Sequence, residues 1–128
     1  QPDIDIHSCQ ITSGQVFSSH SDLSDTLRWT ALVSGILPDV SLAASTGVHE
    51  WKDVIKCILA GASAVQLCTT VYKNGMEIVT QMLTCLEEWM AQQKYQSIDE
   101  FKGRLSFSKA PNASRYERTQ FMKYFGSV

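Results

Sequence analysis

Small residues and hydroxyl side chains end two short apolar runs of this sequence. They are Ser45, Thr46 and Gly47 after the run 40–44, and Cys68 and Thr69 after the run 62–67. Hydroxyl groups and uncrowded backbone N–H groups donate hydrogen bonds, and small side chains let a ligand approach the backbone closely. Donors of this kind bind anions, phosphate groups above all, where strands end and helices begin. The first prediction from the sequence is therefore a phosphate site.

The elements that have to position these residues alternate along the chain. The two apolar runs have the composition of strands covered on both faces, and the segment between them has the length and apolar spacing of one helix. Parallel strands of this kind carry their sites at their C-terminal ends. The expected elements are an extended segment at 4–11, helices at 23–36, 48–60 and 75–93, strands at 40–44 and 62–67, a short capped helix from Ser97, and a last helix at 113–125.

This order predicts an α/β protein with parallel strands. Two architectures are compatible with it: a small flavodoxin-like sheet, or the C-terminal part of a (β/α)8 TIM barrel followed by a short helical tail. Barrels often bind phosphate with the loops after their seventh and eighth strands, which favours the barrel. We therefore expect residues 1–107 to form the C-terminal portion of a barrel and residues 108–128 to form the tail.

Composition excludes several classes of protein. The chain of 128 residues has the length of one domain, and its net charge of -2 offers no basis for binding nucleic acid or an anionic membrane. No apolar run of the sequence is long enough to span a bilayer. The cysteines are widely spaced and form no CxxC pair, so we expect reduced thiols in a cytoplasmic protein and no metal site. These residues are Cys9, Cys57, Cys68 and Cys85.

Two longer stretches resemble a known family. The stretch "AASTGVHEWKDVIKCILAGASAVQLCTTVYKNG" at 43–75, followed by "LEEWMAQQKYQSIDEFKGRLS" at 86–106, is similar to the C-terminal part of the dihydroorotate dehydrogenases, and most similar to the soluble class 1 enzymes and their relatives. The resemblance implies a (β/α)8 barrel that holds FMN and oxidises dihydroorotate to orotate in pyrimidine biosynthesis. By position it implies that the FMN phosphate is surrounded by Ser45, Thr46, Gly47, Cys68 and Thr69. More loosely, it implies that Ser13 and Gly14 lie beside the flavin.

The chain also departs from the family pattern. Thr46 and Cys68 stand where the family has glycine, which narrows the pocket but keeps the backbone donors. The family's catalytic base, a Cys or Ser on a mobile loop, lies upstream of the matched residues, and no replacement is present. General base catalysis needs a titratable group within reach of the substrate proton. We therefore expect no catalytic residue in this chain and no activity of the 128 residues alone, and we expect that a chain beginning at Gln1 was cut from a longer protein.

Other interpretations stay open at this point. Ser45, Thr46 and Gly47 are also typical of a helix cap and turn, and Cys68 of a small buried side chain. The chain could instead belong to another phosphate-binding TIM-barrel enzyme, or be a non-catalytic, self-associating domain. Exposed strand edges and an uncovered barrel face favour association, so we expect a homo-oligomer that binds FMN weakly. We also expect Gly47→Val to lower the FMN occupancy of the intact enzyme sharply while leaving its fold in place.

Overall fold

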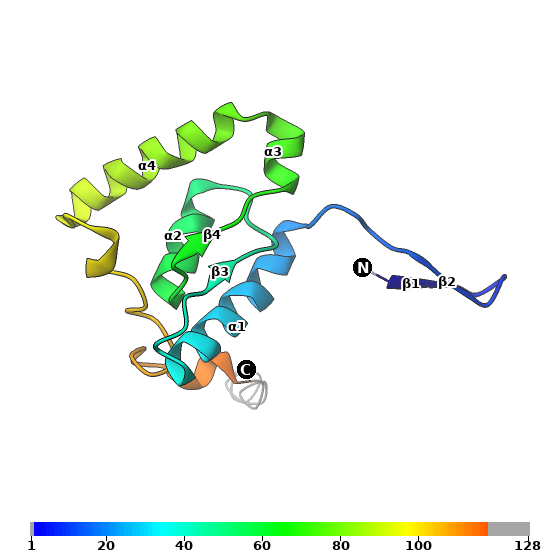
Figure 1. The fold of residues 1–128 in the computed structure, drawn as a ribbon, viewed down its shortest axis with the longest axis horizontal. Helices are drawn as coiled ribbons and strands as arrows, with labels where there is room; N and C mark the ends of the chain where they lie inside the picture. Colours follow the sequence, from blue (N-terminus) through cyan, green and yellow to red (C-terminus); the bar gives the residue numbers. More distant parts are fainter. Residues whose placement is uncertain (1, 118–128) are drawn as a thin grey trace, which may run out of the picture.

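The computed structural model describes residues 2–117, which form a helical body around a short parallel sheet, with a β-hairpin at the N-terminal end (Figure 1). The mixed α/β composition agrees with the prediction. The elements in chain order are β1 (Pro2–Asp5), β2 (Gln10–Ser13), the 3-10 turn η1 (His20–Asp22), α1 (Leu23–Ile36), β3 (Ala43–Ala44), α2 (Trp51–Ala60), β4 (Ala64–Val65), α3 (Thr69–Asn74), α4 (Glu77–Gln93), and the 3-10 turns η2 (Ile98–Glu100) and η3 (Ala113–Tyr116).

The sheet of the body consists of β3 and β4, which pair in parallel with Ala43 opposite Ala64. The parallel pairing of these two segments is as predicted. The predicted strands, 40–44 and 62–67, were too long, because the ladder covers only two residues of each. A ladder persists only where both strands keep a hydrogen-bonding partner. Within the described residues, neither β3 nor β4 has a partner on its outer edge.

The helices lie close to their predicted positions, with one addition. α2 begins at Trp51 because Glu50 is the extended N-cap residue, and α1 spans the predicted range. No element was predicted between the strand at 62–67 and the helix at 75–93, whereas residues Thr69–Asn74 form α3. Gly75 then adopts a φ of +81°, a conformation that helices cannot continue through, and α4 starts two residues later.

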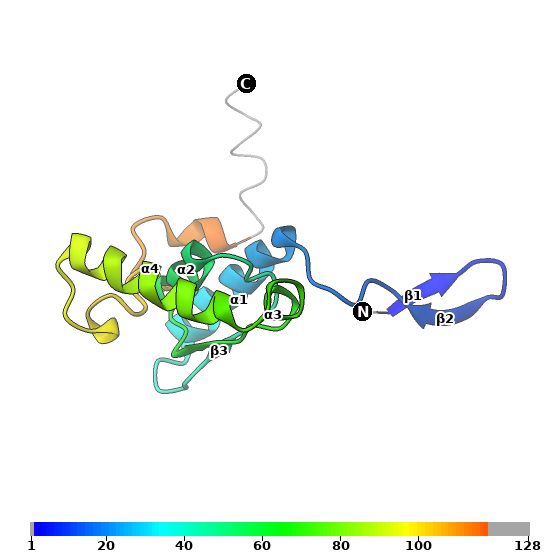
Figure 2. The same ribbon diagram turned by 90° about the horizontal axis from the view of Figure 1, so that it is seen from above.

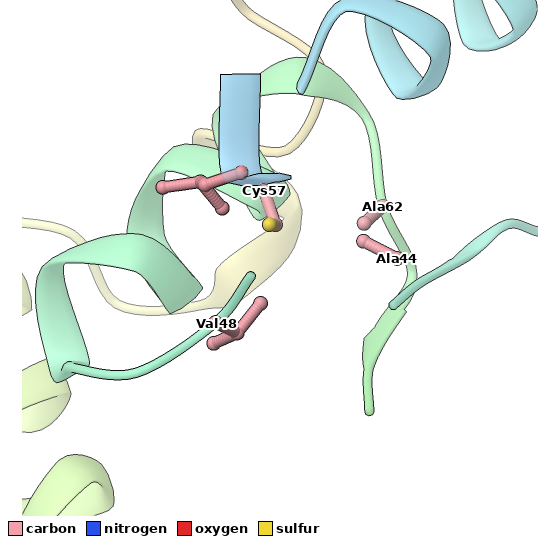
Figure 3. Packing of buried hydrophobic residues seen from close by; sticks show 5 residues of the cluster. Ala44, Val48, Cys57 and Ala62 are labelled. Carbon is pink, nitrogen blue, oxygen red and sulfur yellow. The ribbon is translucent and has the colours of Figure 1, made fainter. Parts of the chain in front are cut away.

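Two hydrophobic clusters form the core. The first joins the start of α1 to the sheet and α2, and Figure 3 shows Ala44 and Ala62 next to each other, with Cys57 and Val48 on the side of α2. The second joins α2 and α4 through Ile55, Ile58, Leu86 and Phe101, with aromatic rings packed around Phe101. These contacts bury one apolar face of α2 and one of α4. Leu83, on α4, is 53% exposed.

The segment 101–107 ties the ends of α1 and α2 together. The N–H groups of Gly103 and Leu105 donate to carbonyls of α2, at 2.9 Å each, and the N–H of Phe107 donates to the Ala31 carbonyl of α1 at 3.0 Å. The backbone passes so close to α1 that a Cβ on Gly35 would lie 2.8 Å from Phe107. Ile58 and Leu59 lie in the last turn of α2, where the carbonyls have no partner within the helix.

The N-terminal hairpin extends away from the body (Figure 2). β1 and β2 pair antiparallel with Ile4 opposite Ile11, and both side chains are exposed. The sequence pattern predicted one extended segment at 4–11, whereas this stretch contains parts of two strands and the turn between them. No helix among residues 2–117 has the length and apolarity needed to cross a membrane.

The described part of the chain ends in a short 3-10 turn. η3 covers Ala113–Tyr116, where the sequence predicted the start of a helix at 113–125. Most of that predicted helix, and most of the predicted tail 108–128, falls at residues 118–128, outside the described part of the chain.

Candidate functional site

A cavity of about 250 Å³ lies where the loops after β3 and β4 meet the segment that leads into α1. It brings together all five residues that the sequence assigned to a phosphate: Ser45, Thr46, Gly47, Cys68 and Thr69. Its remaining lining residues are Gln15, Val16, Phe17, Ser18, Asp22, Val48 and Gln66. Ser13 and Gly14 are not among the lining residues, so their predicted contact with a cofactor has no support in this cavity; the four residues that follow them line it instead.

Gly47 makes a close approach to the protein backbone. Its φ is +80°, and a Cβ at this position would lie 2.3 Å from the backbone nitrogen of Leu23. The space that the missing side chain leaves is therefore filled by the start of α1. The expectation that Gly47→Val would leave the fold in place is wrong on this geometry, because any side chain here collides with α1 and opposes the backbone conformation.

Thr46 adopts a backbone conformation that suits glycine better than threonine. Its φ is +84°, a region in which β-branched residues are rare. The hydroxyl of Thr26, on α1, lies 2.9 Å from the Ser45 carbonyl and 2.8 Å from the Thr46 carbonyl and donates to this pair. The loop after β3 is thus held in a strained shape by a side chain of α1.

The strained loop presents backbone donors without partners. Within residues 2–117, no acceptor lies within hydrogen-bonding range of the N–H groups of Thr46, Gly47 and Val48, and Gly47 and Val48 are buried. Buried N–H groups are nearly always paired in folded proteins, with protein, water or ligand. All three residues line the cavity. This arrangement can donate several hydrogen bonds to an anion.

Hydroxyl groups connect the opposite wall of the cavity to the loop after β3. The backbone N–H of Ser18 and its hydroxyl both donate to the hydroxyl of Thr69, each at 3.1 Å. The same Ser18 oxygen lies 3.4 Å from Nε2 of His49. Thr70 in turn donates to the His49 carbonyl at 3.2 Å. Ser18 and His49 were not assigned to the site from the sequence, since neither is near the other or near Thr69 along the chain.

Charge in the cavity is sparse. Asp22 is the one charged side chain among the described lining residues, and its carboxylate accepts the Ser19 N–H at 2.8 Å. At the rim, Phe17 stacks on Tyr72 with ring centroids 4.8 Å apart, and the ammonium of Lys73 lies 5.8 Å from the Phe17 ring centre. An anion would therefore be bound by dipoles and neutral donors, with Asp22 opposing it.

The two loops that line this cavity lie in a part of the sequence that matches a known protein family. The family model for dihydroorotate dehydrogenase matches residues 29–90, which include both loops. Residues 29–90 of this chain are therefore similar in sequence to the dihydroorotate dehydrogenases. The prediction from the sequence is confirmed at this level.

Curated relatives of the dihydroorotate dehydrogenase family match the same part of the chain. A Streptococcus agalactiae protein assigned the name dihydroorotate dehydrogenase A (fumarate) is 37% identical over 70 residues, which are 55% of this chain and 23% of the relative. Dihydroorotate dehydrogenase (fumarate) of Saccharomyces bayanus is 32% identical over 76 residues, which are 59% of this chain and 24% of the relative. Dihydroorotate dehydrogenase A (fumarate) of Lactococcus lactis subsp. cremoris is 32% identical over 75 residues, again 59% and 24%. The matches thus span about a quarter of the relatives' length.

A buried carboxylate, that of Asp53, accepts hydrogen bonds from the backbone at the end of the loop after β3. Asp53 has no exposed surface, and it accepts the backbone N–H groups of His49 and Glu50, at 3.1 Å each, and the ammonium of Lys56 at 3.0 Å. Burial raises the pKa of Asp53, but the hydrogen bonds from Lys56, His49 and Glu50 outweigh it, so the pKa lies below its usual value. His20, Glu50 and Asp53 place ligand atoms within 4.8 Å of one another. Because the Asp53 oxygens already accept these bonds, we assign the group to capping α2.

Cys68 differs from its expected setting. Its position at a strand end favoured a small buried side chain, whereas Cys68 is exposed at the N-cap of α3 and lines the cavity. The buried cysteine of this region is Cys57, and burial, reinforced by the charge of Asp53, raises the pKa of its thiol to about 12.

Proposed function

We propose that the chain is part of an FMN-dependent, dihydroorotate dehydrogenase-like oxidoreductase of the cytoplasm, acting on dihydroorotate in pyrimidine biosynthesis. In this proposal the cavity holds the FMN phosphate. The observation that carries it is that five residues assigned from the sequence, in two loops more than 20 residues apart, line a single cavity together with partnerless backbone N–H groups.

The residues of the cavity fit a phosphate group. The N–H groups of Thr46, Gly47 and Val48 would donate to its oxygens, and the hydroxyls of Ser45 and Thr69 add two further donors. When bound, FMN supplies the ring that accepts the hydride from the substrate. The resemblance places the family's catalytic base upstream of the matched residues, so we assign this chain the role of holding the cofactor and no catalytic residue.

The proposal extends to architecture. β3 and β4 would be two neighbouring strands of a (β/α)8 barrel, with residues 1–107 forming part of the FMN-binding barrel and residues 108–128 a helical tail. The open edges of β3 and β4 support the further proposal that the 128-residue chain self-associates and is inactive by itself.

Binding of FMN and riboflavin to the 128-residue chain tests the phosphate assignment. Riboflavin lacks only the phosphate, so we expect FMN to bind more tightly, as measured by quenching of flavin fluorescence. Thr69→Val removes a hydroxyl while keeping the shape of the side chain, and should weaken FMN binding without changing riboflavin binding. Thr84→Val, on the exposed face of α4, is the matched control. Equal affinities for the two flavins would contradict the proposal, because the phosphate would then make no contact.

A further inference from the structure

A chain of hydrogen-bonding groups connects a titratable imidazole to the cavity. It runs from Nε2 of His49 to the hydroxyl of Ser18, 3.4 Å away, and from there to the hydroxyl of Thr69, 3.1 Å away. Thr69 and Ser18 both line the cavity, and Thr69 is buried. His49 is not among the lining residues and lies two residues before the first residue of α2. The three residues come from three different segments that meet on the side of the body facing the hairpin (Figure 1).

The backbone of His49 is held from several sides, and its imidazole contacts the hydroxyl of Ser18. Its N–H donates to Asp53, and its carbonyl accepts from the hydroxyl of Thr70. The charged and titratable groups around it are the His20 ring, with centroids 6.1 Å apart, the neighbouring Glu50, and the Asp53–Lys56 pair. Asp22 lies on the cavity side.

The direction of the hydrogen bonds in this chain decides what Thr69 offers to a ligand. Each hydroxyl has one hydrogen, and the Thr69 oxygen already accepts the backbone N–H of Ser18. If Ser18 also donates to Thr69, the Thr69 hydrogen is free to point into the cavity, and Ser18 must accept from an N–H at Nε2 of His49. In the reverse direction Thr69 donates to Ser18, Ser18 donates to a bare Nε2, and neither hydroxyl has a hydrogen left for a ligand.

We propose that His49 is a positioning residue for an anionic ligand, acting through Ser18 to direct the Thr69 hydroxyl hydrogen into the cavity. Protonated imidazole carries hydrogen on both nitrogens, so it permits only the direction that favours an anion. Neutral imidazole permits both directions. Anion binding and protonation of His49 therefore strengthen each other. The inference rests on the proposed function only in requiring that the cavity takes an anionic group such as phosphate.

Inorganic sulfate is the probe that isolates this coupling, because sulfate, unlike phosphate or FMN, does not titrate near neutral pH. Its dissociation constant for the 128-residue chain is measured by NMR titration between about pH 5.5 and pH 8, the range in which histidine changes charge. We expect about tenfold tighter binding at the acid end, the value of one hydrogen bond to a charged acceptor. Ser18→Ala and His49→Gln should each abolish the pH dependence of sulfate binding. Ser18→Thr, which keeps a hydroxyl at this position, should preserve it.

Two histidine controls make the test specific. His20→Gln removes the other imidazole near the site, and His7→Gln removes one in the hairpin; both variants should keep the pH dependence of the unchanged chain. Loss of the pH dependence in His20→Gln, or its survival in His49→Gln or Ser18→Ala, would overturn the inference. Sulfate bound equally at both ends of the pH range would overturn it as well. Sulfate binding that depends on His49, in a chain that does not distinguish FMN from riboflavin, would support the inference while contradicting the proposed function.

Discussion

Replacing Thr46 with glycine tests whether the loop after β3 is strained. At a φ of +84° the side chain of an L-residue costs about 1–2 kcal/mol, and glycine removes this cost. Glycine also increases the freedom of the unfolded chain, which offsets about 0.5–1 kcal/mol of the gain. The expected net result of Thr46→Gly is stabilisation by about 1 kcal/mol, equivalent to a melting temperature about 3–5 °C higher for a domain of this size.

Urea or thermal unfolding of a matched series provides the assay. Thr46→Ala removes the same hydroxyl and methyl groups as Thr46→Gly but keeps Cβ, so it should gain little, and Thr46→Asn should fall between them because asparagine tolerates this region. Thr26→Val should destabilise, since it removes the hydroxyl that holds the Ser45 and Thr46 carbonyls. If alanine stabilised as much as glycine, the side-chain contacts of Thr46 would be the source of the effect, and the strain argument would fail.

Three further results are expected. Asp22→Asn should tighten sulfate binding about fivefold, because it removes a repulsion of about 1 kcal/mol between the Asp22 carboxylate and a sulfate in the cavity. Asp25→Asn should leave sulfate binding unchanged, because Asp25 does not line this cavity. Asp53→Asn should destabilise the chain by about 1–3 kcal/mol at pH 7. The pKa of Asp53 is lower in the folded than in the unfolded state, so its contribution to stability is present above the unfolded pKa of about 3.9 and is lost as the pH falls through the folded pKa. The difference in stability between Asp53→Asn and the unchanged chain should therefore be smaller at pH 3 than at pH 7. At pH 8, iodoacetamide should label Cys68 and leave Cys57, whose pKa is about 12, until the chain is unfolded; labelling of both at equal rates would contradict the burial of Cys57.

The parts of the fold that could be predicted from sequence are those set by local pattern. The apolar spacing of 23–36, closed by Pro38, was sufficient to place α1, and small residues at the ends of two apolar runs were sufficient to place both loops of the cavity. Strand length could not be predicted in the same way, because apolar composition does not reveal how far two segments stay paired.

The parts that could not be predicted depend on contacts between distant segments. Ser18 and Thr69 are 51 residues apart, and the local sequence around neither residue indicates that they form a hydrogen bond. The role of Gly47 was misjudged for a related reason. A glycine shows that something approaches closely, but the sequence does not show whether this is a ligand or, as here, the backbone at Leu23.

The bonds from 103–107 to α1 and α2 have a consequence for the order in which the protein can form. Both helices are synthesised well before this segment, yet the carbonyls of Ala31, Ile58 and Leu59 each accept a hydrogen bond from it. During translation, the bonds from this segment to α1 and α2 therefore form only after the chain has emerged past Phe107.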